Sequence, residues 1–506
     1  MFQKIISIQN LKIKLKKFRL NNKKIVLCHG VFDLLHLGHI NHFREAKKYG
    51  DILIVSLTPD RFVNKGPGRP AFNEKNRLEA ISSLSVVDYV VLNNSKTAVS
   101  IIKEIRPNIY CKGPDYIDHS NDITTEIKNE IKAIKEIKGK VIYTLGKVFS
   151  SSNLINRFDF SQNSNNKIIK KIKKSISFAK IESLLDGIKN LKILVIGETI
   201  IDEYVFCEAL GKSGKEPVLV LRKMKNEIYL GGAAAITGHL STFSSNIKLL
   251  SMVGEKNNKL NIIKKFLPKK IQLDYIKKDN SPTIYKRRFL DHISKNKLLG
   301  VYDLNDEPLG IKNEKLLLKK LKMTIPKYDL VIVTDYGHGF ISSNAAKVIC
   351  NKSKFLALNA QINAANTGYH TMQKYKHIDC VIINENEIRQ EFRNKNEDLK
   401  ILMKSLAKKQ KIKDLIVTRG TEGSILYNKK INKFEICEAF AKKALDKVGA
   451  GDAMLSLISP CLKLGIEKEL SLLVGSLAAA HSVETMGNKF YVDKKNIIKS
   501  IQHLIK

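Results

Sequence analysis

Residues 28–39 read CHGVFDLLHLGH and gather three of the chain's 12 histidines directly after an apolar run. The run predicts a buried strand, and the residues after it predict a helix. His36 and His39, three apart at the start of that helix, can face one way. Gly30 and Gly38 let backbone approach a ligand closely, and a helix N-terminus attracts phosphate. Paired imidazoles there would donate hydrogen bonds to oxygens that gain charge during displacement, as a triphosphate site requires.

A second string, DKVGAGDAML at residues 446–455, joins a turn of small residues to an apolar helix. Gly449, Ala450 and Gly451 predict a tight turn whose exposed N–H groups form a nest for an anion. Asp452 follows at once, beside the expected position of a transferred phosphoryl group, where it would accept the proton of a substrate hydroxyl. Each glycine taken alone is as typical of a turn or of close packing as of a ligand site.

Two similar strands would position these strings. KKIVLCHG and LKILVIGE each predict a buried strand that ends in glycine and leads into a loop and a helix. Further apolar strands alternate with helical patterns after both, which indicates an α/β protein with two doubly wound parallel sheets. Ligands of such sheets bind at the carboxyl ends of the strands. We predict domains at residues 1–157 and 179–506, joined by a linker at residues 158–178 that begins polar and becomes Lys-rich.

The composition argues against several classes of protein. With 506 residues and 43% apolar side chains, the chain predicts a globular protein of two or three domains. No apolar run reaches the ~18 residues of a membrane span. The Lys-rich N-terminus lacks a secretory cleavage site and predicts an amphipathic helix. The seven scattered cysteines, without a Cys-x-x-Cys pair, fit a reducing cytoplasm and argue against a disulfide framework or a zinc site.

The formal net charge of +39 raises the question of a nucleic-acid partner. The excess is nearly all lysine, because only 13 of the 88 basic residues are arginine, and the lysines are spread along the chain. No RNA-binding or helix-turn-helix signature accompanies them. We therefore expect solvated lysine-rich faces that favour anionic small substrates, with no nucleic-acid or membrane partner.

The histidine string also resembles a known motif. GVFDLLHLGH matches the His-x-Gly-His motif of the nucleotidyltransferase superfamily, and residues 23–157 resemble its Rossmann-like, cytidylyltransferase-like branch. NKGPGRPAFNEKNR, CKGPDY and FSSSNLIN resemble that family's Lys- and Arg-bearing segment, its Lys-Gly-x-Asp-Tyr stretch and its Ser-rich turn. The resemblance implies catalytic roles for His36 and His39. It implies nucleotide or phosphate contacts by His29, Gly30, Phe32, Lys65, Arg77, Lys112, Ser151 and Ser152.

The chemistry that this resemblance implies is nucleotidyl transfer. A sugar-phosphate oxygen would attack the α-phosphate of ATP or CTP, pyrophosphate would leave, and Mg²⁺ would accompany the triphosphate. Catalysis would need positioning and charge stabilisation without a covalent intermediate. A metal site is the other interpretation of His36 and His39, although only Asp33 lies near enough in sequence to add a ligand.

The second string is similar to the ribokinase family of sugar kinases. LGGAAA, NENE, VTRGTEGS and GAGD follow one another in that family's order and spacing, and the resemblance covers residues 191 to about 500. It implies that Asp452 is the catalytic base and that residues 449–451 form the anion hole. It implies sugar contacts by Asp202, Gly231 and Gly232. It implies an ATP site bordered by Thr418, Gly420 and Gly423, and Mg²⁺ held through water by Asn384 and Glu387.

The chain departs from the kinase pattern at several positions. Lys447 stands where the family usually has Thr, and Ala235 where it usually has Asn. Asn359 begins an Asn-Ala-Gln string where the family has one like Asp-Pro-Lys. These departures leave the sugar undefined. They also leave open a kinase-like domain that binds sugar as a regulator or scaffold while only the transferase is active.

Together the two halves resemble the fused heptose-phosphate kinases and nucleotidyltransferases of lipopolysaccharide synthesis, with the domain order inverted. That resemblance implies a bifunctional enzyme that phosphorylates a sugar phosphate, with heptose 7-phosphate as the expected substrate, and transfers a nucleotidyl group to a sugar 1-phosphate. Residues 213–232 predict two short strands flanking a turn. Such strands cover the sugar in this family and often pair between subunits, so a homodimer is expected by analogy.

Overall fold

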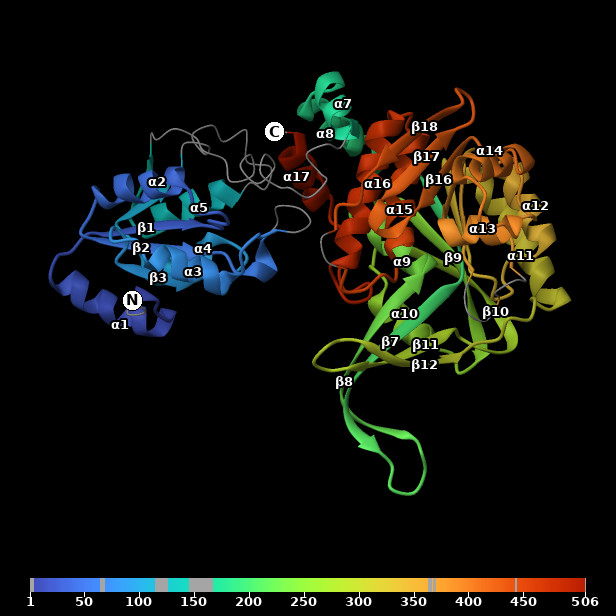
Figure 1. Ribbon diagram of the computed structural model, residues 1–506, viewed down its shortest axis with the longest axis horizontal. Coiled ribbons are helices and arrows are strands. Elements are labelled where there is room, and N and C mark those ends of the chain that lie inside the picture. The colour runs from blue at the N-terminus through green and yellow to red at the C-terminus, as the bar shows by residue number, and fades with distance from the viewer. Residues whose placement is uncertain are drawn as a thin grey trace. The chain divides into compact units, whose positions relative to one another are not determined.

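The computed structural model describes residues 4–63, 69–113, 126–144, 167–362, 366, 370–441 and 444–505. The chain divides into two compact units, one comprising residues 1–165 and 498–504 and the other residues 166–497 (Figure 1). Nowhere in these described ranges is a helix both long enough and apolar enough to cross a membrane.

The first unit is built on a five-stranded sheet in the order β3-β2-β1-β4-β5, and all its neighbouring strands are parallel. The strands are β1 (Ile25–Gly30), β2 (Ile52–Leu57), β3 (Tyr89–Leu92), β4 (Ile109–Lys112) and β5 (Lys140–Tyr143). The helices are α1 (Ile8–Leu20), α2 (Leu37–Lys47), α3 (Glu74–Ser82), α4 (Ala98–Ile105) and α5 (Glu126–Glu136). This topology confirms the predicted doubly wound parallel fold, and α1 confirms the predicted N-terminal helix.

Alternation along β1 explains how helices cover both faces of this sheet. Ile25 and Leu27 belong to a core shared with α1, α4 and α5, whereas Val26 and Cys28 belong to a core shared with α2 and α3. Successive side chains of a strand point to opposite faces, so a continuous apolar run fills both cores.

The second unit contains a nine-stranded sheet in the order β10-β9-β6-β13-β14-β15-β16-β17-β18. Its strands are β6 (Ile193–Gly197), β9 (Ile247–Lys256), β10 (Gln272–Pro282), β13 (Leu330–Asp335), β14 (Leu356–Ala360), β15 (Cys380–Asn384), β16 (Asp414–Thr418), β17 (Ser424–Asn428) and β18 (Lys433–Cys437). The strands from β10 to β16 pair in parallel, as predicted, and β17 and β18 add antiparallel edges.

Helices flank this sheet, and α11 to α14 share one large apolar core with it. The helices are α7 (Lys167–Ser175), α8 (Phe178–Asp186), α9 (Ala233–Ser241), α10 (Leu260–Phe266), α11 (Ile311–Thr324), α12 (Ser343–Lys352), α13 (Glu385–Phe392), α14 (Leu399–Lys409), α15 (Ala450–Lys463) and α16 (Lys468–Val483). The helix α17 (Lys494–Ile505) follows them along the chain. The described part of the predicted linker is helical: α7 buries Ile168, Ile169 and Ile172, and its Lys171 pairs with Glu435 and Glu469.

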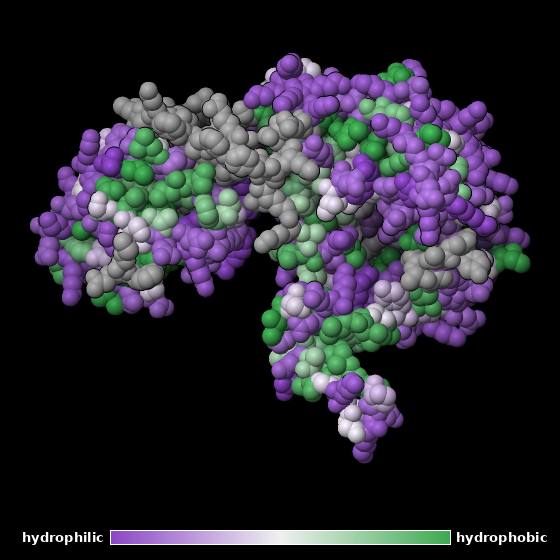
Figure 2. All heavy atoms as spheres, in the orientation of Figure 1, coloured by the Kyte–Doolittle hydropathy of each residue, from purple (hydrophilic) through white to green (hydrophobic). Residues whose placement is uncertain are grey.

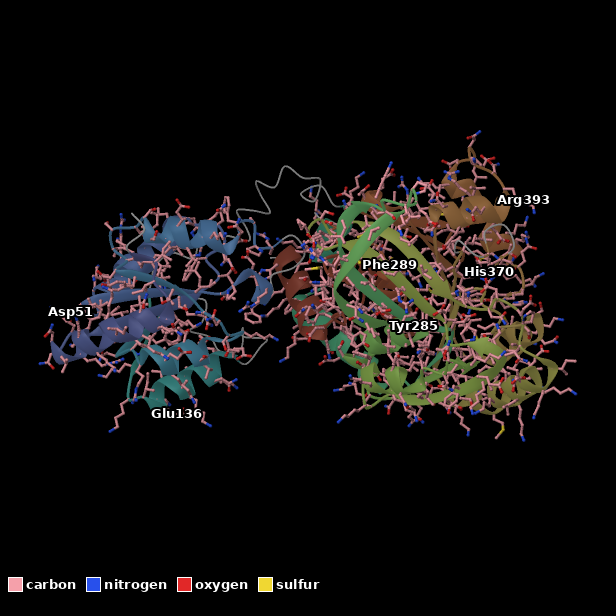
Figure 3. All side chains as sticks on the ribbon, turned by 90° about the horizontal axis from the view of Figure 1, so that it is seen from below. Asp51, Glu136, Tyr285, Phe289, His370 and Arg393 are labelled. Carbon is pink, nitrogen blue, oxygen red and sulfur yellow. The ribbon has the colours of Figure 1, made fainter. Side chains whose placement is uncertain are left out.

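A separate four-stranded sheet, here called the lid sheet, has the order β12-β11-β7-β8. Its strands are β7 (Thr199–Lys212), β8 (Leu219–Gly232), β11 (Tyr285–Asp291) and β12 (Lys297–Asp303). Tyr285 and Phe289 mark β11 in Figure 3. The predicted pair of short strands at residues 213–232 was wrong, because β8 is one continuous strand paired antiparallel with β7. The turn lies before it, since β7 ends at Lys212 and β8 begins at Leu219.

Candidate active sites

The candidate kinase site lies where the parallel strands of the large sheet end. Asp335, Asn384 and Thr418 are the last residues of β13, β15 and β16, and Glu198 follows β6 directly. Asn384 and Thr418 are partners in the ladder between β15 and β16. Because parallel strands end at one edge, residues far apart in sequence meet there, as is usual for ligand sites in such sheets.

Asp452 stands in the first turn of α15, directly after the predicted anion-binding turn. Gly449 is the N-cap of this helix and has φ of 87°, a conformation that favours glycine. A Cβ at Gly449 would lie 2.7 Å from Oδ1 of Asn488, whereas a Cβ at Gly451 would meet open space. The turn therefore leaves room beside the helix N-terminus, where N–H groups favour an anion.

The carboxylate of Asp452 is only 9% exposed and accepts a hydrogen bond from the Tyr336 hydroxyl at 2.8 Å. Burial raises the pKa of Asp452 to about 7, and the Asp202 charge adds to the rise. The Tyr336 hydrogen bond and the Lys286 ammonium oppose it. A carboxyl group poised near neutrality suits a general base.

Asp202 lies on β7 and pairs with Arg288 of β11. A Cβ at Gly231 would lie 2.4 Å from Oδ2 of Asp202, so only glycine allows this approach. Gly232 has φ of 60°, and a Cβ there would lie 2.4 Å from the Glu198 carbonyl oxygen. The structure thus brings all three predicted sugar contacts together beside Asp452, on the β7–β8 pair.

Lys286 of β11 contributes a buried ammonium to this site, and its Nζ lies 5.5 Å from the centre of the Tyr302 ring. It is the ladder partner of Asp202 across β11 and β7, and it is 8% exposed. Burial lowers the pKa of its ammonium, while the charges of Asp202 and Glu198 oppose that shift. It therefore supplies positive charge next to Asp452 and to the expected acceptor.

In the first unit, His36 and His39 lie as the sequence predicted, at the start of α2. Their rings stack with centroids 3.9 Å apart and planes inclined by 19°. His36 is the N-cap, and its Nδ1 accepts a hydrogen bond from the Gly38 N–H at 3.1 Å. Phe32, with φ of 46°, packs edge-on against His39 at 5.3 Å between centroids. The two imidazoles therefore form one unit at a helix N-terminus.

His29 and Gly30 lie at the end of β1 and support this arrangement. Nδ1 of His29 lies 3.1 Å from the Ser56 hydroxyl, and Nε2 lies 3.4 Å from that of Thr58. Burial, with the Lys112 charge, lowers the pKa of His29 to about 3, so its ring is neutral. A Cβ at Gly30 would approach the Phe32 ring to 3.0 Å. Gly30 therefore allows the close approach of Phe32, the ring that packs against His39.

Arg77 and Lys112 are committed to partners within the protein. The Arg77 guanidinium is buried and donates to the carbonyls of Val31, Thr58 and Phe72 and to Asp60. It thereby fastens the loops that follow β1 and β2.

Lys112 forms a buried ion pair with Glu130 at 2.7 Å, and Glu130 also accepts from the Tyr110 hydroxyl. The phosphate contacts that the resemblance implies for Arg77 and Lys112 stay predictions. Lys65, Ser151 and Ser152 lie outside the described residues.

No group of three or more His, Cys, Asp or Glu side chains in the described ranges is arranged to hold a metal ion. His36 and His39 stack on one another, and Asp33 is engaged elsewhere: its carboxylate accepts from the Ala71 N–H at 2.6 Å and pairs with Arg69 at 3.4 Å. The geometry therefore favours phosphate contact over metal ligation at this pair.

Two family models match the chain. The cytidylyltransferase-like model matches residues 27–158, which include the His36–His39 pair. The model described as pfkB family carbohydrate kinase matches residues 190–495, more than half of the chain, and includes Asp452. The chain belongs to the pfkB family of carbohydrate kinases. In this pfkB-family chain the cytidylyltransferase-like part precedes the kinase part, which confirms the predicted order.

The pfkB-family chain is also similar to bifunctional proteins named HldE. It is 38% identical over 146 residues to that of Aliarcobacter butzleri, covering 28% of this chain and 29% of the relative. It is 27% identical over 299 residues to that of Nitratiruptor sp., covering 58% and 62%. Each match spans less than two thirds of the relative. Phosphofructokinase-2 of Escherichia coli, solved with substrates and products, has the same fold, with a TM-score of 0.52 at 12% identity over 62% of this chain and all of that one.

The predicted nucleotide-side residues of this pfkB-family kinase gather at one edge. Asn384 and Glu387 form a capping box at the start of α13: Asn384 accepts from the Glu387 N–H at 2.8 Å, and Glu387 accepts from the Asn384 N–H at 2.7 Å. Burial raises the pKa of Glu387 to about 7, and the charge of Asp452 contributes. Gly420 and Gly423, after Thr418, both have positive φ, and a Cβ at Gly423 would strike the Cys437 carbonyl.

The three departures from the kinase pattern differ in consequence. Ala235 is buried in α9 and offers no polar group to a sugar. The Asn359 side chain donates to the Ile382 carbonyl at 2.7 Å, which joins β14 to β15. Lys447 is exposed just before the anion-binding turn. Of these three positions, Ala235 is the one whose side chain has no hydrogen-bonding group.

Sequence reasoning missed Glu198, Tyr336 and Lys286. Glu198 accepts from the backbone N–H groups of Tyr336 and His338 at 3.1 and 3.2 Å, and burial raises its pKa to about 7. Glu198 and Tyr336 each follow a buried parallel strand, so the rule that ligands bind at strand ends could have found them. Lys286 lies in the cationic string YKRRF, which carries no local signal of its role.

Proposed function

We propose that the chain is a bifunctional enzyme of sugar-nucleotide synthesis. The second unit would use ATP to phosphorylate a sugar phosphate, heptose 7-phosphate by resemblance, at its anomeric hydroxyl. The first unit would transfer a nucleotidyl group from ATP or CTP to a sugar 1-phosphate. The observation that carries the kinase assignment is the buried Asp452 at the N-terminus of α15, beside the turn at residues 449–451 and the Asp202 carboxylate.

In the kinase reaction, Asp452 would take the proton of the acceptor hydroxyl as the oxygen attacks the γ-phosphate of ATP and ADP leaves with the bridging oxygen. The N–H groups of the turn would hold the transferred phosphoryl group. Asp202 would bind sugar hydroxyls next to Gly231. Asn384 and Glu387 are hard oxygen donors and would hold Mg²⁺ through water, and the ion would neutralise phosphate charge.

In the transferase reaction, no protein nucleophile is needed. The imidazoles of His36 and His39 would donate to the phosphate oxygens of the triphosphate, and the N-terminus of α2 would add favourable dipoles. The sugar-phosphate oxygen would then displace pyrophosphate in line. The stacking of the His36 and His39 rings at the start of α2 supports this proposed role.

The kinase should be limited by the ionisation of Asp452. We expect kcat to rise with pH through an apparent pKa near 7, because only the ionised carboxylate accepts a proton. Lys286→Met removes the cation that lowers this pKa. The rise of kcat with pH should therefore move to higher pH by about 1 unit or more. A pH series of ADP formation checks this, with Lys413→Met as control. An apparent pKa of kcat that is unchanged in Lys286→Met would contradict this prediction.

We also propose a homodimer formed through the lid sheet. Val220 and Met224 of β8 and Leu299 and Val301 of β12 are exposed, and Figure 2 shows apolar surface on these projecting strands. An exposed apolar face of this kind is typical of an interface.

Light scattering should give the wild type a mass twice that of the 57.2 kDa chain. The double variant Val220→Glu with Met224→Glu should give the single-chain mass, while Ile311→Glu, at an exposed position on α11, should remain dimeric. A wild type that runs at the mass of one chain would overturn the proposal.

A further inference from the structure

Asp446 lies just before the anion-binding turn and accepts hydrogen bonds from four directions. Two are from the backbone near the turn: the Val448 and Gly487 N–H groups, each at 3.1 Å. Two are from the lid sheet: the Tyr204 hydroxyl at 2.5 Å and the Lys297 ammonium at 2.7 Å. The Asp446 side chain is wholly buried, while that of Lys297 is 42% exposed. Asp446 is therefore a junction between the lid sheet and the turn.

The two lid contacts come from different strands. Tyr204 lies on β7 and Lys297 on β12, and β11 separates these strands in the lid sheet. The Lys297 ammonium also lies 6.0 Å from the centre of the Tyr204 ring. One carboxylate thus gathers both strands, so a shift of either strand would change its hydrogen bonds.

The segment around Gly487 completes the connection. Gly487 has φ of 55°, and a Cβ there would lie 2.7 Å from the Tyr229 ring. Asn488 donates to the carbonyl of Leu230 at 3.1 Å, and its Oδ1 is the atom that a Cβ on Gly449 would strike. This segment is therefore packed between the root of the lid sheet and the N-cap of α15.

The charge of Asp446 depends on the lid sheet. Burial acts to raise the pKa of Asp446, but the bonds from Lys297 and Tyr204 hold it below its ordinary value. Among the described residues Lys297 is the counter-ion of Asp446, and its loss from a fully buried carboxylate is costly. The carboxylate would then protonate or draw in water, and either change disturbs its hydrogen bond to Val448.

We propose that Asp446 is a positioning residue that makes the phosphoryl-binding turn depend on the lid sheet. Val448 and Gly449 hold the geometry needed for transfer only while Lys297 and Tyr204 bind the Asp446 carboxylate. The inference rests on the proposed kinase function. The position of the lid sheet, which carries the sugar contact Asp202, would thus determine the geometry of the turn that receives phosphate.

Lys297→Met in the full chain tests the proposal. We expect kcat for sugar phosphorylation to fall about tenfold or more, because small misplacement of reacting groups is costly. The KM values for acceptor and ATP should change by less than about twofold, since Lys297 touches neither. Lys297→Arg should restore most of kcat. Lys413→Met is the matched control, because Lys413 forms a comparable pair, at 2.5 Å, with the largely buried Asp379 outside the lid sheet. An unchanged kcat in Lys297→Met, or an equal loss in Lys413→Met, would overturn the proposal.

A second readout does not depend on catalysis. Amide hydrogen exchange of residues 446–452 should speed up in Lys297→Met and in Tyr204→Phe. In the double variant the increase should be smaller than the sum of the two single increases, because both substitutions act through Asp446. Tyr204→Phe also serves if Lys297→Met fails to fold. If the wild type phosphorylates no sugar, the proposed kinase function fails, while hydrogen exchange still tests the coupling of the lid sheet to the turn through Asp446. Exchange of these amides at the wild-type rate in both variants would refute that coupling.

Discussion

Asp452→Asn is expected to lower sugar-dependent ADP formation by about 10²–10⁴-fold and to leave pyrophosphate release unchanged. The carboxylate is the only described acidic group placed in the first turn of α15, directly after the turn that would receive phosphate. An amide cannot take a proton, although it can still accept the Tyr336 hydrogen bond that now reaches Oδ1. The loss should therefore fall on kcat, with little change in acceptor binding.

A phosphorus NMR time course measures this directly. The protein is given Mg²⁺, ATP and D-glycero-D-manno-heptose 7-phosphate, and an anomeric phosphate signal should appear together with ADP. Asp279→Asn, an exposed carboxylate on β10, is the control and should match the wild type. A folded wild type that changes no sugar across a broad panel would instead indicate a silent kinase unit that binds sugar as a regulator or scaffold.

Removal of either stacked imidazole should cut nucleotidyl transfer by about 10²-fold or more, since each would donate to charge that develops on phosphate. His36 also caps α2, so His36→Ala would mix a catalytic loss with a capping loss of about 1 kcal/mol. His36→Asn keeps a capping side chain and removes the imidazole. His39→Ala removes the second ring without touching the cap.

The two proposed activities of the chain provide the control for both experiments. His36→Asn and His39→Ala should lose pyrophosphate release from ATP or CTP in the presence of sugar 1-phosphate and retain ADP formation by the kinase. Asp452→Asn should show the reverse. If both histidine variants kept a near-normal kcat for nucleotidyl transfer, the first-unit site would lie elsewhere.

Local chemistry accounts for the parts of both sites that the sequence predicted. His36 and His39 meet because residues three apart on a helix are neighbours, and Asp452 follows its turn because small residues allow that turn. The strands were predictable too, because continuous apolar runs alternate with helical patterns throughout both units. These features depend on spacing within a few residues.

Long-range register accounts for what the sequence could not predict. Lys286 is buried beside Asp202 only because β11 pairs with β7, and nothing within YKRRF distinguishes it from its neighbours. Lys112 forms an ion pair with Glu130, and Arg77 donates to three carbonyls and to Asp60. The motifs that contain Lys112 and Arg77 do not indicate these partners. The β8 strand was misread as two because its continuity is set by pairing with β7.

The sequence by itself therefore determined the two α/β units, their order, the stacked-histidine helix start and the turn before Asp452, because each is written in local periodicity and turn chemistry. The tertiary structure alone decided which charges surround Asp452 and which carboxylate joins the lid sheet to the turn. Those outcomes depend on burial and on the pairing of distant strands, and it is burial that brings the pKa of Asp452 to about 7.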